Sequence, residues 1–429
     1  MTQIRQYLEN NKDAMIELLK ELVAVPSVQG DAEEGFPFGR EPARALSIML
    51  EKCREAGFAV ENVENYAGSA DINDTEPELA VLTHLDVVPA GDGWSSQPFE
   101  LTQDGDKLVG RGTIDDKGPA VAAFFAAKAV KELGISLKKG IRLIFGTNEE
   151  NGSADLAYYR SKHTIPPMVF TPDGEYPVIN AEKGMLRIYF STEFKDGLIK
   201  GGEVINAVPK YCTFDIKTYE NGEVSQIYGK HHGTAAHAST PEKGNNAITE
   251  FLSCQGYLNP VIGRLSKLFP HGELNGKSCG LGFRDDISGD MTCVLSLLNT
   301  KDGRLCGGID IRFPLDRTKA EISSIICEKL RSAGFEIDSC EGVEPHCTDE
   351  NSTFVQSLLK TYERVTGDKG CCIAIGGGTY VHEIEGGVAF GAEFPGEDGH
   401  MHSPDEFITV ENLLKNAEIM AEAMIEICG

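Results

Sequence analysis

The stretch IRLIFGTNEENGSADL, residues 141–156, decides the fold of this chain. Its apolar run is typical of a buried strand, and turn-forming residues follow the run at once. Two carboxylates, Glu149 and Glu150, stand side by side just after it. Adjacent side chains at a strand end point in different directions, so the two carboxylates can take different tasks. We therefore expect one of them to bind a metal ion and the other to transfer a proton.

The same pattern of an apolar run with a polar end occurs in ELAVLTHLDVV (78–88) and in MVFTPDGEYPV (168–178). A helix-like stretch, KGPAVAAFFAAKAVKELG (117–134), separates two of the runs. Strands that alternate with helices indicate an α/β fold with a mainly parallel sheet. Such sheets gather their functional loops at the carboxyl ends of the strands. Five polar residues at these ends are therefore expected to converge: His84, Asp86, Glu149, Glu150 and Asp173.

From about residue 185 the sequence is typical of antiparallel strands, and a β-α-β element ends near residue 346. The stretch STFVQSLLKTYERVTG (352–367) then predicts a helix like those of the first part of the chain. We therefore predict an α+β domain at 185–346. It is inserted into an α/β domain whose two segments are 1–184 and 347–429.

Composition excludes several classes of partner. The 429 residues suit roughly two domains of ~100–200 residues each. A net charge of -26 argues against nucleic acid or an anionic membrane surface as a partner. The N-terminus lacks the apolar segment of a signal peptide, and no stretch reaches the ~18 apolar residues of a spanning helix. Twelve cysteines without a CxxC pair predict free thiols in a reducing compartment, and hence a cytoplasmic location.

Five residues form a candidate site for two divalent cations: His84, Asp115, Glu150, Asp173 and His402. Imidazole nitrogens and carboxylate oxygens suit Zn²⁺, Mn²⁺ or Co²⁺. We name Zn²⁺ first, although the spacing does not choose between the three ions. Asp115 is suited to bridge the pair, because one carboxylate can span two ions ~3.5–4 Å apart. The remaining positive charge would lower the pKa of a shared water toward ~7.

Two further carboxylates are available for other tasks. Glu149, with no metal to bind, can take the proton of the water and pass it to the leaving amine. Asp86 can hydrogen-bond the far ring nitrogen of His84 and fix its tautomer. Taken singly, such residues have plainer explanations, and Asp116 is well placed to cap the following helix. Their joint occurrence at the strand ends of one α/β domain favours the site.

Six blocks of the sequence carry a resemblance to a known family: THLDVVPAGDGW (83–94), GRGTIDDKGP (110–119), NEENGS (148–153), TPDGEYP (171–177), HHGTAAHASTP (231–241) and HSPDE (402–406). They resemble the signature blocks of the co-catalytic metallopeptidases, which include aminoacylases, carboxypeptidase G2-like enzymes and dipeptidases. The second block, with INAVP (205–209) and GGGTY (376–380), is most similar to peptidase V and carnosinase-type dipeptidases. The resemblance covers nearly the whole chain.

The resemblance implies that Asp115 bridges two metals. It assigns one metal to His84 and Asp173, and the other to Glu150 and His402. His402 is favoured over His400 by the match to HSPDE.

The same resemblance makes Glu149 the general base and acid and Asp86 the orienting carboxylate. It also implies a cis peptide bond between Asp115 and Asp116.

The inserted domain resembles the lid of this family. His237 would stabilise the tetrahedral oxyanion. Arg312, with Asn206, would hold the carboxylate of the substrate. Gly376, Gly377 and Gly378 lie in a loop whose backbone would approach the substrate closely, although a plain flexible turn is the alternative.

The expected activity is metal-dependent hydrolysis of dipeptides by a water that two metals activate. The alternative is an amidohydrolase of N-acylated amino acids or C-terminal amino-acid conjugates on the same site. A non-catalytic binding protein on this fold is a remote third hypothesis, because every expected ligand position is filled. The length of the inserted domain favours a monomer. A homodimer through the lid, with His237 supplied by a partner subunit, is the alternative.

Overall fold

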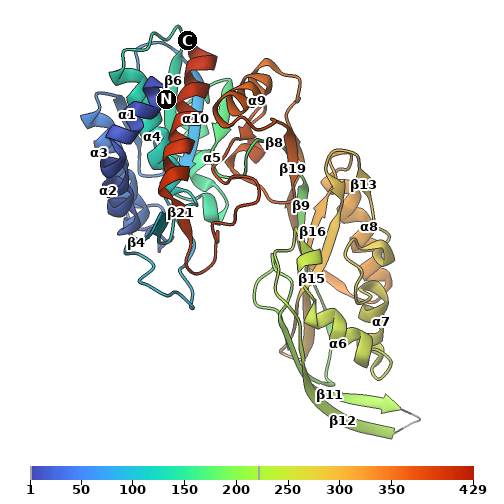
Figure 1. Ribbon diagram of the computed structural model, residues 1–429. Helices are drawn as coiled ribbons and strands as arrows, with labels where there is room; N and C mark the ends of the chain where they lie inside the picture. The colour runs from blue at the N-terminus through green and yellow to red at the C-terminus, as the bar shows by residue number, and fades with distance from the viewer. Residues whose placement is uncertain (1, 221–222) are drawn as a thin grey trace. The chain divides into compact units, whose positions relative to one another are not determined.

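The computed structural model describes residues 2–220 and 223–429, which form two compact units (Figure 1). The first unit contains Met1–Asn180, Thr348–Ile373 and Thr379–Gly429, and the second contains Ala181–Cys347 and Ala374–Gly378. The sequence predicts the changes between domains after residues 184 and 346. The chain passes between the units after residues 180 and 347, and again on either side of 374–378.

The sequence pattern assigns residues 374–378 to the α/β domain, and this assignment is wrong, because the segment groups with the second unit. Two hydrogen bonds join it to that unit. Lys183 N donates to Ile375 O at 2.9 Å, and Arg312 Nη1 donates to Gly376 O at 2.7 Å. Both donors are far away in the sequence, so the pattern of the segment itself gives no sign of this pairing.

The first unit is built on a mixed sheet. Its strands are β1 (Ala59–Val63), β2 (Ala67–Asp71), β3 (Pro77–His84), β6 (Gly140–Gly146), β7 (Met168–Thr171), β8 (Val178–Glu182) and β20 (Val388–Ala389). They lie in the order β1-β2-β6-β3-β7-β20-β8, and β18 (His346–Cys347) and β19 (Cys372–Ile375) also pair with β8. The centre, β6-β3-β7-β20, is parallel, while β1, β2 and β8 pair antiparallel. The predicted α/β fold class is confirmed at this parallel centre.

Helices cover both faces of this sheet. They are α1 (Gln3–Asn10), α2 (Lys12–Val23), α3 (Arg40–Glu55), α4 (Lys117–Glu132), α5 (Ala154–Lys162), α9 (Thr353–Thr366) and α10 (Val410–Cys428). In β3, Leu79 and Val81 belong to a large core that also contains α4 and α10, whereas Ala80 and Leu82 belong to a smaller core with α5. This alternation follows from the period of two along a strand. The C-terminal helix α10 packs against α4 and α1.

A small sheet in the first unit joins residues that are distant in the sequence. It consists of β4 (Thr102–Asp104), β5 (Lys107–Val109) and β21 (Phe407–Thr409), in the order β21-β5-β4. All of its pairings are antiparallel. The sheet brings the segment just before β21 beside the segment just after β5. At this point Gly110 N donates to Glu406 O at 2.9 Å.

The second unit is an antiparallel sheet with helices. Its main strands are β9 (Gly184–Glu193), β10 (Gly197–Gly201), β11 (Tyr211–Glu220), β12 (Glu223–His232), β15 (Thr292–Lys301), β16 (Arg304–Phe313) and β17 (Glu336–Val343), and a two-stranded ribbon adds β13 (Arg284–Asp285) and β14 (Gly289–Asp290). The order of the main sheet is β12-β11-β10-β15-β16-β9-β17. Three helices, α6 (Ala247–Gln255), α7 (Pro260–Leu268) and α8 (Lys319–Ser332), lie along one side of this sheet (Figure 1). The predicted α+β class of the inserted segment is confirmed.

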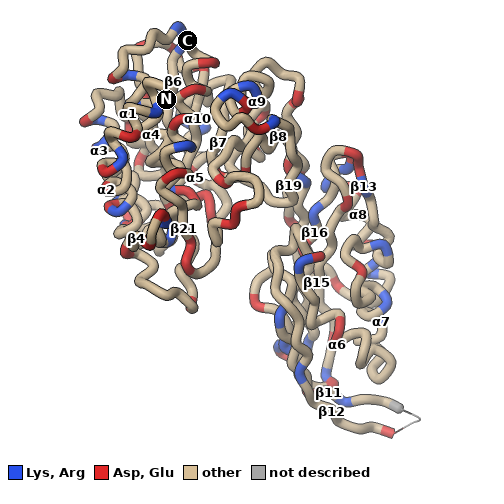
Figure 2. Tube along the Cα trace, in the orientation of Figure 1, with Lys and Arg blue, Asp and Glu red and all other residues tan. Residues whose placement is uncertain are grey.

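No helix in the described part of the chain is long and apolar enough to cross a membrane. Acidic residues occur along both units (Figure 2), in agreement with the net charge of -26.

Candidate metal centre

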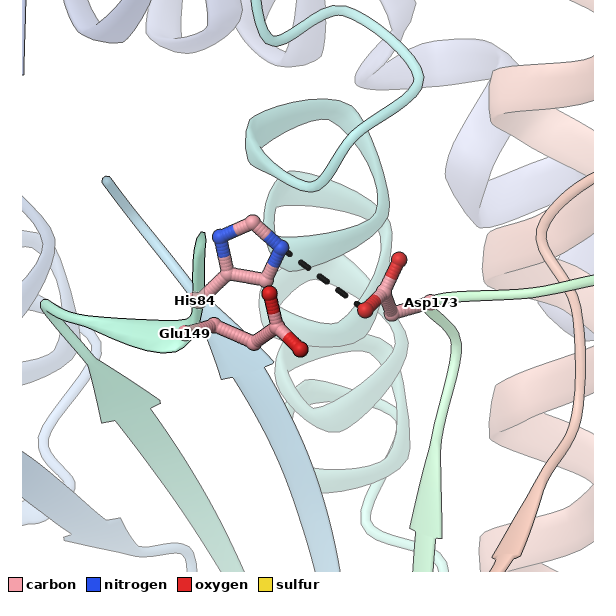
Figure 3. Close-up of side chains that lie close together, drawn as sticks. All are labelled: His84, Glu149 and Asp173. Carbon is pink, nitrogen blue, oxygen red and sulfur yellow. Dashed lines mark ion pairs between the residues drawn. The ribbon is translucent and has the colours of Figure 1, made fainter. Parts of the chain in front are cut away.

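The predicted metal ligands come from loops at one edge of the first sheet. His84 ends β3, and Asp173 follows β7 (Figure 3). Glu150 lies in the short 3-10 turn Glu149–Asn151 that follows β6. Asp115 lies just before α4, and His402 lies in the loop that leads to β21. The structure brings all five side chains together within the first unit.

Asp115 lies between the two histidines. Its Oδ1 atom is 2.9 Å from His84 Nε2, and its Oδ2 atom is 2.8 Å from His402 Nε2. The two oxygens of this carboxylate therefore face different imidazoles. This is the arrangement that a ligand shared by two cations requires.

Each histidine also has its own carboxylate. Asp173 Oδ2 is 3.8 Å from His84 Nε2, and Glu150 Oε2 is 3.1 Å from His402 Nε2. By their shortest contacts the donor atoms therefore form two sets, one around each imidazole, with Asp115 common to both. Ligand atoms of His84, Asp115 and Glu150 also lie within 4.8 Å of one another. Four of the five side chains are at most 10% exposed, but His402 is 50% exposed. His402 also has a φ of 58°, in the left-handed region that few residues other than glycine adopt.

The raised pKa values of the two histidines show that the candidate metal centre favours positive charge. Burial opposes the charged form of His84, but Asp115 and Asp86 outweigh it and hold the pKa of His84 well above its ordinary value. Burial also opposes the charged form of His402, yet Asp115 and Glu150 raise the pKa of His402 to about 11. A divalent cation would meet the same attraction.

The raised pKa values of two carboxylates show that the same centre disfavours further negative charge. Burial and then the charge of Asp115 raise the pKa of Asp173 to about 7, and the same two causes raise the pKa of Glu150. In the described part of the chain, Glu150 Oε1 is buried without a hydrogen-bond partner. Buried anions crowded in this way are stabilised by cations. The residues therefore fit two divalent ions, held by His84, Asp115 and Asp173 and by Asp115, Glu150 and His402.

Glu149 lies at the same centre and, with His84 and Asp173, forms a group of side chains that could itself hold a metal ion. One of its oxygens lies within 4.8 Å of ligand atoms of His84 and Asp173. Figure 3 shows its side chain beside these two residues. Burial and then the charge of Asp173 hold the pKa of Glu149 well above its ordinary value. A carboxyl with a raised pKa next to the donor atoms is suited to accept and return a proton.

Asp86 differs in detail from the expectation. His84 Nδ1 is 3.0 Å from the backbone carbonyl of Asp86, and 3.5 Å from its carboxylate. The carboxylate instead accepts hydrogen bonds from Glu149 N (3.1 Å) and Glu150 N (3.2 Å). Asp86 therefore fixes the His84 ring mainly through its backbone, and it fixes the Glu149–Glu150 turn through its side chain.

The expectation that the Asp116 side chain caps the helix after it is also wrong. Asp116 stands at the N-cap position of α4, but its side chain makes no capping hydrogen bond. Its Oδ2 atom accepts from His84 N at 3.0 Å and so holds the backbone of a metal ligand. The expected cis peptide bond between Asp115 and Asp116 is present.

Sequence reasoning missed several buried polar residues that support the centre. Asp155 accepts from Thr147 N (2.6 Å), from Asn148 N (2.8 Å) and from the Tyr380 hydroxyl, and so holds the end of β6. Glu406 accepts hydrogen bonds from the loop that carries Asp115. Glu406 lies within the quoted block HSPDE, which is the one signal that could have found it.

In the second unit, Arg312 is buried and already paired. It is 4% exposed, and its Nε and Nη2 atoms donate to Asp310 at 2.7 and 3.1 Å. The edge of the guanidinium that usually grips a carboxylate is therefore occupied by Asp310. Nη1 donates to Gly376 O, so only the remaining N–H groups of Nη1 and Nη2 are available to a ligand.

His237 and Asn206 lie on adjacent extended segments of the second unit. Ala238 N donates to Asn206 O at 2.9 Å, and Ala207 is paired with His237. Ser239 N donates to His237 Nδ1 at 3.3 Å, and a backbone N–H can only donate. The proton of the neutral ring therefore lies on Nε2, where it can be donated to an oxyanion.

Within the predicted glycine loop, the structure requires a glycine at Gly376. A Cβ on Gly376 would meet the Ser239 Cβ at 2.8 Å, which is too close for any side chain. A Cβ on Gly377 would meet only Ile375 Cδ1 at 3.7 Å, an ordinary contact. The backbone therefore approaches closely at Gly376, whereas Gly377 and Gly378 keep their expected role as a prediction only.

Comparison with known proteins identifies the family of the chain. Residues 80–426 match the model of the family described as Peptidase family M20/M25/M40. A protein of Bacillus subtilis (strain 168), named "Putative dipeptidase YtjP", is 32% identical over 97% of each chain. A protein of Staphylococcus haemolyticus (strain JCSC1435), named "Putative dipeptidase SH1171", is 31% identical over 99% of each chain.

Solved structures show the same fold. Human carnosine dipeptidase 1 aligns with a TM-score of 0.67 at 17% identity, over 99% of this chain and 98% of that chain. A Bacillus subtilis protein, YXEP, described as a dinuclear metal binding peptidase, aligns with a TM-score of 0.57 at 12% identity, over 98% of this chain and 99% of that chain. Given the family match over most of its length and the relatives above 30% identity, the chain belongs to peptidase family M20/M25/M40.

Proposed function

We propose that this metallopeptidase hydrolyses dipeptides with two divalent metal ions. One observation carries the proposal: the Asp115 carboxylate lies between His84 and His402, each of which has a further carboxylate of its own. The family is one of peptidases, and relatives at 31–32% identity over nearly the full length are named as dipeptidases.

When bound, the two ions would polarise the scissile carbonyl and acidify a water molecule. Glu149 takes the proton of the attacking water and returns it to the leaving amine. The raised pKa of Glu149 suits this task, because its carboxyl holds a proton more readily than an ordinary glutamate does. Asp86 holds the backbone of Glu149 and keeps its carboxyl near the donor atoms.

The second unit supplies the groups for the rest of the substrate. His237 donates its Nε2 proton to the oxyanion, in the tautomer that Ser239 N favours. Arg312 and Asn206 bind the carboxylate of the dipeptide, and the loop with Gly377 and Gly378 contacts it through its backbone. The Asp310 carboxylate that pairs with Arg312 neutralises much of its charge, so recognition relies on the direction of the remaining N–H groups.

The identity of the ions and the location of the protein extend the proposal. Zn²⁺ is the first choice and Mn²⁺ or Co²⁺ the alternatives, because imidazole and carboxylate ligands suit all three. We place the protein in the cytoplasm, since twelve cysteines without a CxxC pair are typical of a chain kept in a reducing compartment. We further propose that it acts as a monomer.

A substrate panel tests the function. Metal-stripped protein is reconstituted with Zn²⁺, Mn²⁺ or Co²⁺ and assayed with Ala-Ala type dipeptides, tripeptides and N-acetyl amino acids. Dipeptides are expected to be cleaved fastest, and only with metal. Cleavage of N-acetyl amino acids without cleavage of dipeptides would replace the proposal by the amidohydrolase alternative. Binding of both ions without any turnover would support a non-catalytic protein.

A further inference from the structure

Glu406 joins two ligand-bearing loops of the first unit. It is 0% exposed and lies four residues after His402, directly before β21. Its Oε1 atom accepts three backbone hydrogen bonds from the loop before α4: from Gly112 N (3.0 Å), Ile114 N (3.0 Å) and Asp115 N (3.2 Å). One carboxylate oxygen thus fixes the course of the loop that ends in the shared ligand Asp115.

The other oxygen of Glu406 is held by Arg111, which is 1% exposed. Arg111 in turn donates to Ala90 O at 3.3 Å and lies over the ring of Trp94, with its guanidinium carbon 5.1 Å from the ring centroid. This buried pair therefore connects three loops: those after β3, before α4 and before β21. A buried carboxylate is retained in a fold when such partners satisfy both of its oxygens.

His402 depends on this connection more than the other ligands do. Its side chain is 50% exposed, so packing contributes little to its orientation. Its loop is fixed at its far end by Glu406 and by Asp405, whose Oδ1 atom accepts from Ser95 N and Ser95 Oγ at 2.8 and 2.9 Å. His84 and Asp173, by contrast, are at most 10% exposed. His84 is the last residue of β3, and Asp173 lies two residues after the end of β7.

We propose that Glu406 is a positioning residue that sets the distance between Asp115 and His402. It thereby determines the affinity for the ion held by Asp115, Glu150 and His402 more than for the ion held by His84, Asp115 and Asp173. The assignment rests on the two-metal centre of the proposed function. Glu406 acts through the backbone of the loop that carries Asp115 and takes no part in the reaction itself.

The test measures metal binding rather than turnover. Metal-stripped wild type and Glu406→Gln are titrated with Zn²⁺ and Co²⁺ by calorimetry and chelator competition. Glutamine keeps one oxygen for the three N–H groups but turns an N–H₂ toward Arg111. The affinity for one of the two ions should fall about 10- to 100-fold, as for other residues that orient metal ligands, while the other changes less than about threefold.

Double variants identify which ion is affected. In a His402→Ala background the second set has lost a ligand, so adding Glu406→Gln should leave the affinity for the remaining ion within about threefold. In an Asp173→Asn background the same change should cost the full 10- to 100-fold, about as in the wild type. The matched control is Asp71→Asn, which removes a carboxylate paired with Arg142 at 2.7 and 2.8 Å but remote from the ligands. It should change neither affinity.

Equal loss at both ions, or no loss at either, in a folded Glu406→Gln protein would overturn the assignment. If circular dichroism shows that this variant does not fold, Arg111→Lys takes its place, with a smaller loss expected at the same ion and the same two outcomes overturning the assignment. A wild type that binds two ions and cleaves no dipeptide would defeat the proposed function but leave this assignment intact. The two failures are therefore distinguishable.

Discussion

The two units hold their proposed functional groups in different ways. In the first unit, buried carboxylates hold the backbone on either side of the ligands: Asp86 and Asp155 hold the β6 end, and Asp116 holds His84. In the second unit, the groups are held through their own side chains, as Arg312 is by Asp310 and His237 is by Ser239. A metal centre needs fixed ligand positions, and backbone anchoring provides them. Substrate-binding groups need a defined direction and charge, which side-chain partners provide.

The largest effect on turnover is expected at Glu149, which neither orients a metal ligand nor belongs to either set of donor atoms. Glu149→Gln should lower kcat about 10²- to 10⁴-fold, because the proton relay is lost while the ligands remain. Calorimetry should still find two ions bound per chain. Parent-like turnover with both ions in place would remove Glu149 from its role.

Asp155 tests the buried scaffold of the first unit through pH. Burial and then the charge of Asp86 raise the pKa of Asp155 to about 6, so the native state binds this proton more tightly than the unfolded chain does. Its contribution to stability is therefore present at about pH 4 and is lost as the pH rises through about 6. Asp155→Asn cannot titrate, so the parent should lose about 3 kcal/mol of unfolding free energy relative to the variant across this range.

Urea unfolding of metal-free parent and variant between pH 4 and 7 measures that difference. A constant difference across the range would show that Asp155 is not the titrating group. Because both proteins lack metal, the histidines and carboxylates of the centre contribute equally to the two curves.

Arg312 tests how the second unit presents a charged group. Arg312→Lys keeps the charge but loses the fork of N–H groups, so KM should rise about 10- to 100-fold with little change in kcat. The control is Arg187→Ala, since Arg187 Nε lies 3.7 Å from the same Asp310 carboxylate. Equal effects of the two variants on KM would show that Arg312 acts through its pairing with Asp310 and does not bind the substrate itself.

The smallest expected effect is a difference in unfolding free energy between alanine substitutions at two neighbouring glycines. Gly376→Ala should lower the unfolding free energy by about 1–3 kcal/mol, because its Cβ would overlap the Ser239 Cβ. Gly377→Ala should stay within about 0.5 kcal/mol of the parent, since its Cβ meets only an ordinary contact. Similar losses in thermal or urea unfolding would contradict the close approach at Gly376.

The convergence of the proposed metal ligands was predictable from the sequence, because each follows an apolar run or belongs to a recognisable block. Their supports were not, because the partners are distant along the chain: Glu406 and Gly112 are 294 residues apart, and Tyr380 and Asp155 are 225 apart. The sequence indicated Asp86 correctly as a neighbour of His84 but could not show which of its oxygens faces the ring. Likewise, Arg312 in DIRFP gave no sign that Asp310, two residues earlier, already occupies its fork.

The order of the segments has a consequence for synthesis in the cell. His84, Asp115, Glu150 and Asp173 leave the ribosome before most of the second unit, and His402 leaves it after. Helix α10, which packs against α4 and α1, follows later still. A nascent chain therefore carries four of the five proposed ligands, and an apolar face of α4 not yet covered by α10, while the second unit is being translated. Metal loading at that stage would capture an incomplete ligand set, so maturation is expected to wait until His402 and α10 have emerged.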